Sequence, residues 1–338
     1  MREWGTAING PFRARYMRFV IEVLRGQAQV DFVPNALTGV VFSAGLCAAG
    51  WEFGLYGLAG TAAGTATARL LGVDRDRITA GLEGFNACLV AVGCAVLLGA
   101  RHLSTALLAL AAAALVTVLT AAVARLLATW QLPTFTLPFC MTASALTIAA
   151  PGFPRIWHED AGPAALPRAA DGPVSLTFSD LWHGFFANIG QVFFMPQWYV
   201  GLIFLLGLFL AGRRAGVLAC VGSVVGLLTA WALGTPAEQV AEGVAGYNAV
   251  LVTMALCGVV LVADAWSLAY AVAGRRPRPS CTRRWPPSSR RPAATPSPGR
   301  SCWSRWSSWR RRRPSPGCAG SDPAPATRPG RARWPAAR

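Results

Sequence analysis

The chain has 338 residues, of which 54% are hydrophobic and 14% are charged. Soluble domains carry about 25% charged residues, so this composition excludes an ordinary soluble multidomain enzyme and favours a protein that crosses the membrane several times. The net charge of +16 sits at the end of the chain: residues 1–274 balance 14 arginines against 14 acidic residues, whereas residues 275–338 hold 17 arginines and one acid, Asp322.

The first 28 residues are predicted to form a cytoplasmic N-terminal segment. They contain five arginines and no compact apolar region, so a cleavable signal peptide is not expected. Arginines beside a membrane segment favour the cytoplasmic side of the membrane.

Apolar runs occupy most of the following sequence. Several approach the roughly 20 residues that a membrane-spanning helix needs, and the shorter ones fit tilted, broken or half-spanning helices. These runs cover residues 36–51, 55–73, 88–100, 103–129, 199–212, 217–233 and 244–263.

The body of the chain contains an internal repeat. Residues 29–90 align without a gap with residues 191–252, 162 positions later, and 23 of the 62 pairs are identical. Chance gives about 5 identities at typical composition. A duplicated helix bundle without a pore is one interpretation; a pathway built at the interface of the two copies is the one we favour.

We therefore predict an all-α polytopic membrane protein with two inverted homologous repeats. The first repeat covers 29–150, a Pro- and Gly-rich surface connection covers 151–180, and the second repeat covers 181–273 and is incomplete. Each complete repeat has room for about five transmembrane helices plus re-entrant half-helices, and an odd number of crossings gives the two copies opposite orientations.

Each copy begins with a glutamine followed five residues later by a proline, Gln29 with Pro34 and Gln191 with Pro196. Because such a segment is too short to span and proline redirects a helix, we expect a re-entrant half-helix that lines a cavity. An aromatic residue, Phe32 in the first copy, lies one helical turn after the glutamine and shares its face.

A second motif supplies an aromatic residue and, four positions later on the same helical face, a leucine. These residues are Phe85 and Leu89 in the first copy and Tyr247 and Leu251 in the second. Each copy thus offers an amide, two aromatic rings and a leucine. An ordinary aromatic core with a structural glutamine is the alternative to a solute-binding surface.

A third motif, residues 132–139, has two prolines five positions apart. The prolines break a helix and free backbone carbonyls that can line a pore, and Thr136 adds a hydroxyl beside them. Elsewhere the cysteines form no CxxC pair and the histidines belong to no nucleophile signature, so we expect no enzyme activity, no metal and no cofactor.

Five motifs carry a resemblance to a known family: Gln29-Val30-x-Phe32, Gly81-Leu82-x-Gly84-Phe85-Asn86-Ala87, Leu132-Pro133-x-x-Thr136-x-Pro138-Phe139, Gly190-Gln191-Val192-Phe193-Phe194 and Gly243-x-x-Gly246-Tyr247-Asn248-Ala249. Together they resemble the urea transporter family, of bacterial type. The resemblance implies an α-helical homotrimer in the inner membrane with one pore per subunit, which passes urea down its gradient.

The resemblance also implies the residues of a selectivity filter. One end consists of Gln29, Val30, Phe32, Phe85 and Leu89. The other end consists of Gln191, Val192, Phe194, Tyr247 and Leu251, and Thr136 lies at the central constriction. Urea is flat and uncharged, so an aromatic slot with oxygen acceptors admits it, whereas an ion loses its solvation there.

Two acidic residues depart from the expected filter. Asp31 stands where the second copy has Phe193, and Glu83 stands in the Gly81–Ala87 motif at a position that is usually uncharged. A carboxylate near a pore should pair, become protonated or face water. Structural and functional interpretations of both residues remain open.

The C-terminal part departs more strongly. The third motif predicts a counterpart near residues 294–301, but the sequence there has no Leu-Pro-x-x-Thr pattern, and 13 of the 24 prolines follow residue 274. We predict a disordered Arg-, Pro-, Ser- and Trp-rich tail over 274–338. A basic arm for nucleic acid or anionic lipid and a generic tail are possible origins; we favour a reading-frame shift, because the break falls inside a repeat.

The expected partners are therefore urea or a similar small neutral solute and the lipid bilayer, with no nucleic acid. A channel for an amide or ammonia, or a non-conducting truncated membrane protein, is the alternative function.

Overall fold

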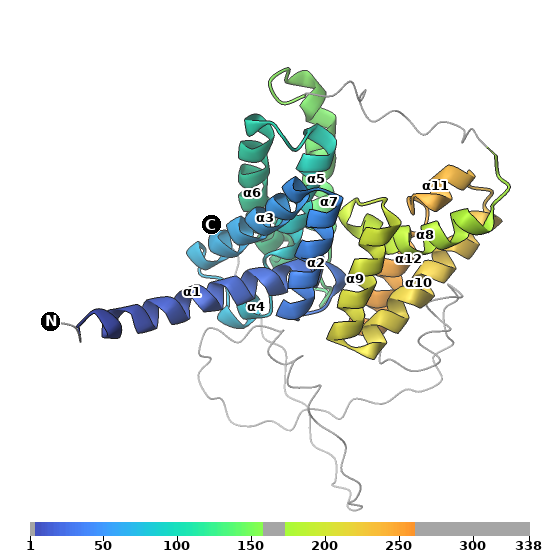
Figure 1. Cartoon of the computed structure of the whole chain (residues 1–338). Helices are drawn as coiled ribbons and strands as arrows, with labels where there is room; N and C mark the ends of the chain where they lie inside the picture. The colour runs from blue at the N-terminus through green and yellow to red at the C-terminus, as the bar shows by residue number, and fades with distance from the viewer. Residues whose placement is uncertain (1–3, 158–172, 261–338) are drawn as a thin grey trace, which may run out of the picture. The chain divides into compact units, whose positions relative to one another are not determined.

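The computed structural model describes residues 4–157 and 173–260 of the chain. Every regular element within these two ranges is a helix, and the helices are joined by turns and short extended segments (Figure 1). The prediction of an all-helical fold is confirmed for this part of the chain. The expected tail and the counterpart of the third motif lie outside the described residues.

The first sequence copy begins with the long helix α1 (Trp4–Ala28), which ends in the 3-10 turn η1 (Gln29–Asp31). Helices α2 (Ala36–Ala49) and α3 (Trp51–Leu70), the short α4 (Arg75–Thr79) and α5 (Phe85–Leu98) follow. Two further helices, α6 (Leu103–Ala128) and α7 (Leu137–Ala149), and a 3-10 turn η2 (Ala150–Gly152) complete this part.

The same order of elements occurs in the second copy. Helix α8 (Phe178–Gly190) leads into the 3-10 turn η3 (Gln191–Phe193), followed by α9 (Trp198–Ala211), α10 (Arg213–Ala232), α11 (Ala237–Ala241) and α12 (Tyr247–Ala255), which ends in a short π-helical segment, Leu256–Val260. The elements η3 to α12 each begin 162 positions after the elements η1 to α5. The sequence identities therefore translate into equal local structure.

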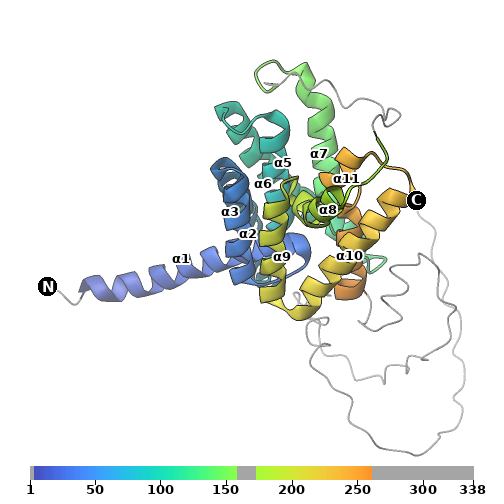
Figure 2. The same cartoon turned by 45° about the vertical axis from the view of Figure 1, so that its right-hand side comes forward.

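Helix packing follows the small residues of the sequence. Helices α3, α5 and α6 lie against one another, and α2 lies beside α9 of the second copy (Figures 1 and 2). On α3 the glycines Gly60 and Gly64 face α5 so closely that an added Cβ would overlap Ala91 and Ala87. Small residues let helix backbones approach in this way, which positions the N-terminus of α5.

The apolar core is shared by both copies. Phe42 on α2 contacts Phe193 and Phe204 of the second copy, with ring centroids 5.5 and 4.8 Å apart. The hydroxyl of Thr38 also donates a hydrogen bond of 2.9 Å to the carbonyl of Gly207. The α2–α9 contact thus joins the two copies through a buried aromatic cluster.

Two described helices, α6 and α10, are long and apolar enough to cross a membrane by length and composition. Two further spans are obtained if each bent pair counts as one: residues 13–31 with α2, and residues 178–193 with α9, both bent by 75°. Helices α5, α7 and α12 are apolar but shorter. The predicted apolar runs therefore correspond to helices, several of which are too short to span alone.

The bends differ from the predicted half-helices. Gln29 and Gln191 do not begin separate helices; each begins the 3-10 turn that ends a longer helix, α1 or α8. The following residues form no regular element up to the start of the next helix, where the side chain of Asn35 caps α2 by accepting a hydrogen bond from the N–H of Leu37. The prolines lie in this irregular stretch and so mark the bend rather than the end of a half-helix.

Candidate functional site

The two turns that carry the predicted filter residues have the same backbone geometry. Phe32 follows η1 with φ 60° and Phe194 follows η3 with φ 63°, and each N–H donates to the carbonyl of the glutamine three residues earlier, at 3.0 and 2.9 Å. A left-handed conformation is costly for a residue with a Cβ and persists only where the surroundings impose it. Such a turn fixes the direction of each phenylalanine side chain through the backbone.

The third motif contacts both of these phenylalanines, through two separate ring pairs. The segment between α6 and α7 places Phe135, itself at φ 44°, edge-on against Phe32, with centroids 5.5 Å apart. One turn into α7, Phe139 contacts Phe194 at 5.8 Å. Sequence reasoning included neither Phe135 nor Phe139 in the site, although both belong to the motif, because the family pattern drew attention to its threonine.

Most of the other predicted filter residues lie in the same hydrophobic cluster. Val30, Phe85, Leu89 and Val192 are buried in it, and Phe32, Phe194, Tyr247 and Leu251 pack against it half-buried. The structure therefore brings together residues from four separate segments of both copies. Both the expected solute-binding surface and the alternative of an ordinary aromatic core predict such a cluster.

The two glutamines have different environments. The Nε2 of Gln29 donates a 2.9 Å hydrogen bond to the carbonyl of Ala80, which follows α4, and the residue is buried. This bond uses one of the two amide N–H donors and orients the amide, so that Oε1 is the acceptor that a solute N–H could use. Gln191 is half-buried at the start of η3.

Thr136 lies at the N-terminus of α7 and is half-buried. Its hydroxyl does not cap the helix, whereas its backbone carbonyl accepts a hydrogen bond of 2.9 Å from the N–H of Cys140. The hydroxyl is thus not used by the helix that Thr136 begins.

A buried asparagine holds the third motif in place. The Nδ2 of Asn86 donates to the hydroxyl of Thr120 at 3.2 Å and to the carbonyl of Phe135 at 3.3 Å. This carbonyl is one of those freed by the break between α6 and α7. Asn86 was not among the predicted site residues; its recurrence as Asn248 was the signal that could have found it.

The two acidic residues that depart from the family pattern differ in whether they have a partner. Glu83 is 2% exposed and pairs with Arg77, Oε1 to Nε 2.6 Å, so it is a structural residue of the turn before α5. Asp31 is buried in η1, and neither of its carboxylate oxygens has a hydrogen-bond partner.

Replacement of Glu83 by glutamine is expected to destabilise the fold by about 3 kcal/mol, because it leaves the largely buried Arg77 guanidinium without its counter-charge. Glu52→Gln is the matched control: its partner Arg101 is 83% exposed, so the loss should be smaller. Thermal unfolding of both variants in detergent measures the difference. Equal losses would show that burial of the Glu83 pair has no energetic consequence.

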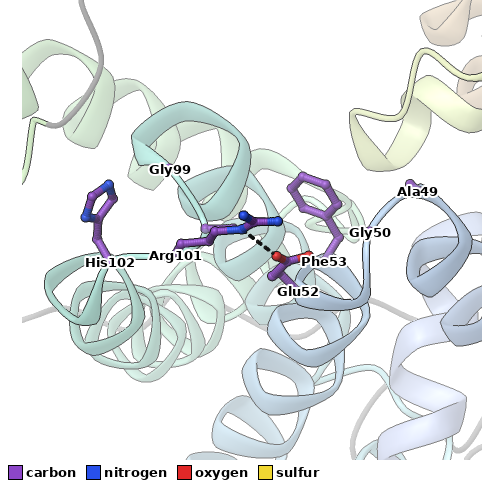
Figure 3. A pocket seen from close by; sticks show the side chains of 8 residues that line it. Ala49, Gly50, Glu52, Phe53, Gly99, Arg101 and His102 are labelled. Carbon is purple, nitrogen blue, oxygen red and sulfur yellow. Dashed lines mark hydrogen bonds and ion pairs between the residues drawn. The ribbon is translucent and has the colours of Figure 1, made fainter.

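A pocket of about 400 Å³ opens on the surface of the helical body (Figure 3). It is formed where the α2–α3 junction faces the α5–α6 junction, and the Glu52–Arg101 ion pair of 2.8 Å crosses it. Its lining residues are Ala49, Gly50, Glu52, Phe53, Gly99, Ala100, Arg101 and His102. None of these is a predicted filter residue.

No group of three or more His, Cys, Asp or Glu side chains that could hold a metal ion occurs in the two described ranges. Cys47, Cys88, Cys94, Cys140 and Cys220 form no disulfide. The arrangement provides acceptor oxygens and ring faces, which suit the binding of a neutral polar molecule.

Apolar helices, with two helix pairs bent by 75° at matching turns, are typical of multi-pass membrane transport proteins. The chain belongs to the urea transporter family: the family described as "Urea transporter" matches residues 20–275. The match ends where the arginine-rich stretch begins. The expected resemblance is thus confirmed, and the chain belongs to a family of transporters, not of enzymes.

Individual relatives are mammalian proteins. The chain is 31% identical over 249 residues to Urea transporter 1 of Rattus norvegicus, covering 72% of this chain and 64% of that protein. It is 32% identical over the same length to Urea transporter 1 of Ovis aries, with the same coverage. The chain therefore spans less than two thirds of the length of these relatives. The bacterial type stays a prediction.

Proposed function

We propose that this chain provides a passive path for urea across a membrane, through a narrow filter between its two copies. The observation that carries the proposal is that the third motif contacts the turn phenylalanines of both copies, Phe32 through Phe135 and Phe194 through Phe139. Two bent helix pairs from different copies thus present aromatic rings to the same segment. The name of the matched family and of the relatives supports urea as the solute.

The proposed halves are related by inversion. The elements from η1 to α5 and from η3 to α12 begin 162 positions apart, and both bent pairs have the same angle of 75°. Repeats of this kind place broken helices at a common midplane when the copies have opposite orientations. We propose the domain boundaries 29–150 and 181–273 for the two halves, with 1–28 cytoplasmic and 151–180 connecting them.

The filter acts by size and by polarity. Gln29, Val30, Phe32, Phe85 and Leu89 form one end, Gln191, Val192, Phe194, Tyr247 and Leu251 form the other end, and Thr136 lies between them. Amide N–H groups of urea face the rings and the free Oε1 of Gln29, whose nitrogen is held by Ala80. An ion would lose its hydration without compensation in an apolar slot, so we propose that ions are excluded.

The assembly and location follow from the family resemblance. We propose a homotrimer in the inner membrane with one path in each subunit. The surface that the helices offer to lipid or to other subunits is apolar: Leu107, Leu110 and Leu115 on α6 and Val217, Val224 and Leu228 on α10 are all exposed. Such faces are stable only against lipid or another apolar surface.

A non-conducting membrane protein is the second candidate, and one observation favours it. Asn86 is buried and holds the Phe135 carbonyl, whereas its counterpart Asn248 is exposed. The sequence at the positions that correspond to the third motif, 294–301, also contains no Leu-Pro-x-x-Thr pattern that could supply such a carbonyl. A one-sided filter of this kind would be wide or unstable.

The test is stopped-flow urea flux into proteoliposomes of the whole chain, compared with empty liposomes. Thr136→Ala should lower the flux about fivefold, because it removes one hydrogen-bonding group worth about 1 kcal/mol from the constriction. Thr147→Ala, on the same helix but bonded to the Ala143 carbonyl, is the matched control and should leave flux unchanged.

Two outcomes separate the candidates. Flux from a folded chain equal to that of empty liposomes would favour the non-conducting protein. If flux is present, competition with thiourea, formamide and ammonia identifies the solute, and inhibition by an amide or ammonia stronger than by urea analogues would replace urea as the preferred one.

A further inference from the structure

The buried carboxylates of the described residues differ in their partners. Glu22, Glu52 and Glu83 are each paired with an arginine: Arg69, Arg101 and Arg77, respectively. Asp31 is 1% exposed, and both its oxygens are buried without a hydrogen-bond donor. A buried ionised carboxylate without a partner costs several kcal/mol, so this place suits the neutral acid.

The charges around η1 offer Asp31 no counter-charge. Helices α1 and α5 pack against η1, and α5 carries no charged side chain, only the thiols of Cys88 and Cys94. At the end of α1, Glu22 is paired with Arg69. Arg25 is directed to the end of α4, where its Nη1 donates to the carbonyl of the last helical residue, Thr79, at 2.9 Å.

Other elements of this core are equally free of charge. Helices α2 and α9, which carry Phe42 and Phe204, contain no acidic or basic residue; their titratable groups are the thiol of Cys47 and the phenol of Tyr199. Glu83, before α5, is already bound by Arg77. Ionisation of Asp31 would therefore leave a negative charge that none of the ion pairs in the described residues compensates.

The second copy indicates what this position requires. Its counterpart Phe193 is fully buried and packs its ring against Phe42 and Phe204, at 5.5 and 5.0 Å. An aromatic side chain at this point fixes η3 by packing alone. In the first copy a carboxyl group occupies the same place, between Val30 and Phe32 of the filter turn.

We propose that Asp31 is a positioning residue that makes urea permeation sensitive to pH. The neutral acid fits the apolar core and keeps η1 in the geometry that orients Gln29 and Phe32. The ionised form moves toward water, and because Asp31 lies in the same three-residue turn as Gln29, this movement displaces the filter end. Permeation therefore falls as the pH rises. The effect arises in the first copy only, because the second copy has Phe193 at this position. The inference rests on the proposed function.

The experiment measures urea flux in proteoliposomes of the whole chain from about pH 5 to about pH 9, with the same pH on both sides. The neutral form of Asp31 holds the filter turn in place, so flux should follow the neutral fraction. Above the pKa of an acid this fraction falls by about tenfold per pH unit, so the parent should lose flux about tenfold or more over this range. Asp31→Asn, which keeps the shape without a proton to lose, and Asp31→Phe, which copies the second half, should both give flat profiles.

Asp76→Asn is the matched control, since Asp76 is exposed at the start of α4 and should leave the pH profile of the parent unchanged. A flat profile for the parent, or the same pH-dependent loss in Asp31→Asn, would overturn the proposal. A pH dependence that Asp76→Asn removes would overturn it as well.

A second measurement keeps the inference apart from the proposed function. A buried acid that stays neutral in the folded state but ionises in the unfolded chain lowers stability as the pH rises above the unfolded-state value, about 3.9 for Asp. The melting temperature in detergent should therefore fall with pH more steeply in the parent than in Asp31→Asn. Without urea flux at any pH the proposed function fails, while equal melting profiles overturn the role of Asp31.

Discussion

Urea flux is expected to fall by about tenfold or more when Gln29 is replaced by alanine, because the change removes two functions at once. It deletes the Oε1 acceptor, and it leaves the Ala80 carbonyl without its donor at a partly buried site, which costs about 1 kcal/mol. Loss of the acceptor weakens the binding of the solute, and loss of the donor to Ala80 destabilises the turn after α4. Stopped-flow measurements in proteoliposomes test the combined effect.

The matched control is Gln239→Ala on α11, where the glutamine is exposed and lies outside the filter. Its flux should equal that of the parent. Gln29→Glu separates the two functions of Gln29, because it keeps oxygen acceptors but loses the donor to Ala80. Undiminished flux in Gln29→Ala, from protein with parental thermal stability, would remove Gln29 from the proposed filter.

The largest expected loss of stability belongs to Gly81→Ala. Gly81 has φ 81°, and an added Cβ would lie 2.5 Å from the backbone C of Arg25 and the backbone N of Gly26. The positive φ costs an alanine about 1–2 kcal/mol, and the contact with backbone forces α1 away from the turn before α5. We expect a loss of about 3 kcal/mol or more, visible as a lower melting temperature in detergent and poor recovery of folded protein.

Gly72→Ala isolates the first of these costs. Gly72 has φ 70°, but nothing lies within 4 Å of the position of its Cβ, so the variant should lose only the conformational part. Gly212→Ala, at an extended φ and in open space, should be neutral. If Gly81→Ala were no less stable than Gly72→Ala, the close approach of α1 to the turn before α5 would not exist.

The helices and the position of the two turns that begin at Gln29 and Gln191 could be predicted from the sequence because they depend on local patterns. Apolar runs predict α6 and α10. The 162-residue offset of the repeat predicts where η3 to α12 begin once η1 to α5 are known. The form of the bend could not be predicted in this way. A proline indicates that the helix changes direction, but the left-handed backbone of Phe32 depends on tertiary contacts.

The residues that sequence reasoning missed act through contacts between distant segments. Phe135 became part of the site through its ring contact with Phe32, and Asn86 through its bond to the Phe135 carbonyl. Pattern and spacing along the chain contain no information on such pairs. The fate of Asp31 and Glu83 was left open for the same reason, since the partner of Glu83 is Arg77 and the surroundings of Asp31 come from other helices.

The hydrogen bond from Thr38 to Gly207 joins residues 169 positions apart, and the rings of Phe42 and Phe204 meet at the same seam. During synthesis the first half therefore emerges before the helix α9 that covers its α2 surface. The contact between α2 and α9 can form only after more than a hundred further residues have been added. Long-range contacts of this kind slow folding and prolong the exposure of apolar surface that is prone to aggregation. Biogenesis of the protein should consequently depend on the insertion machinery that shelters the first half, and ribosome stalling between the halves should direct the nascent chain to proteolysis.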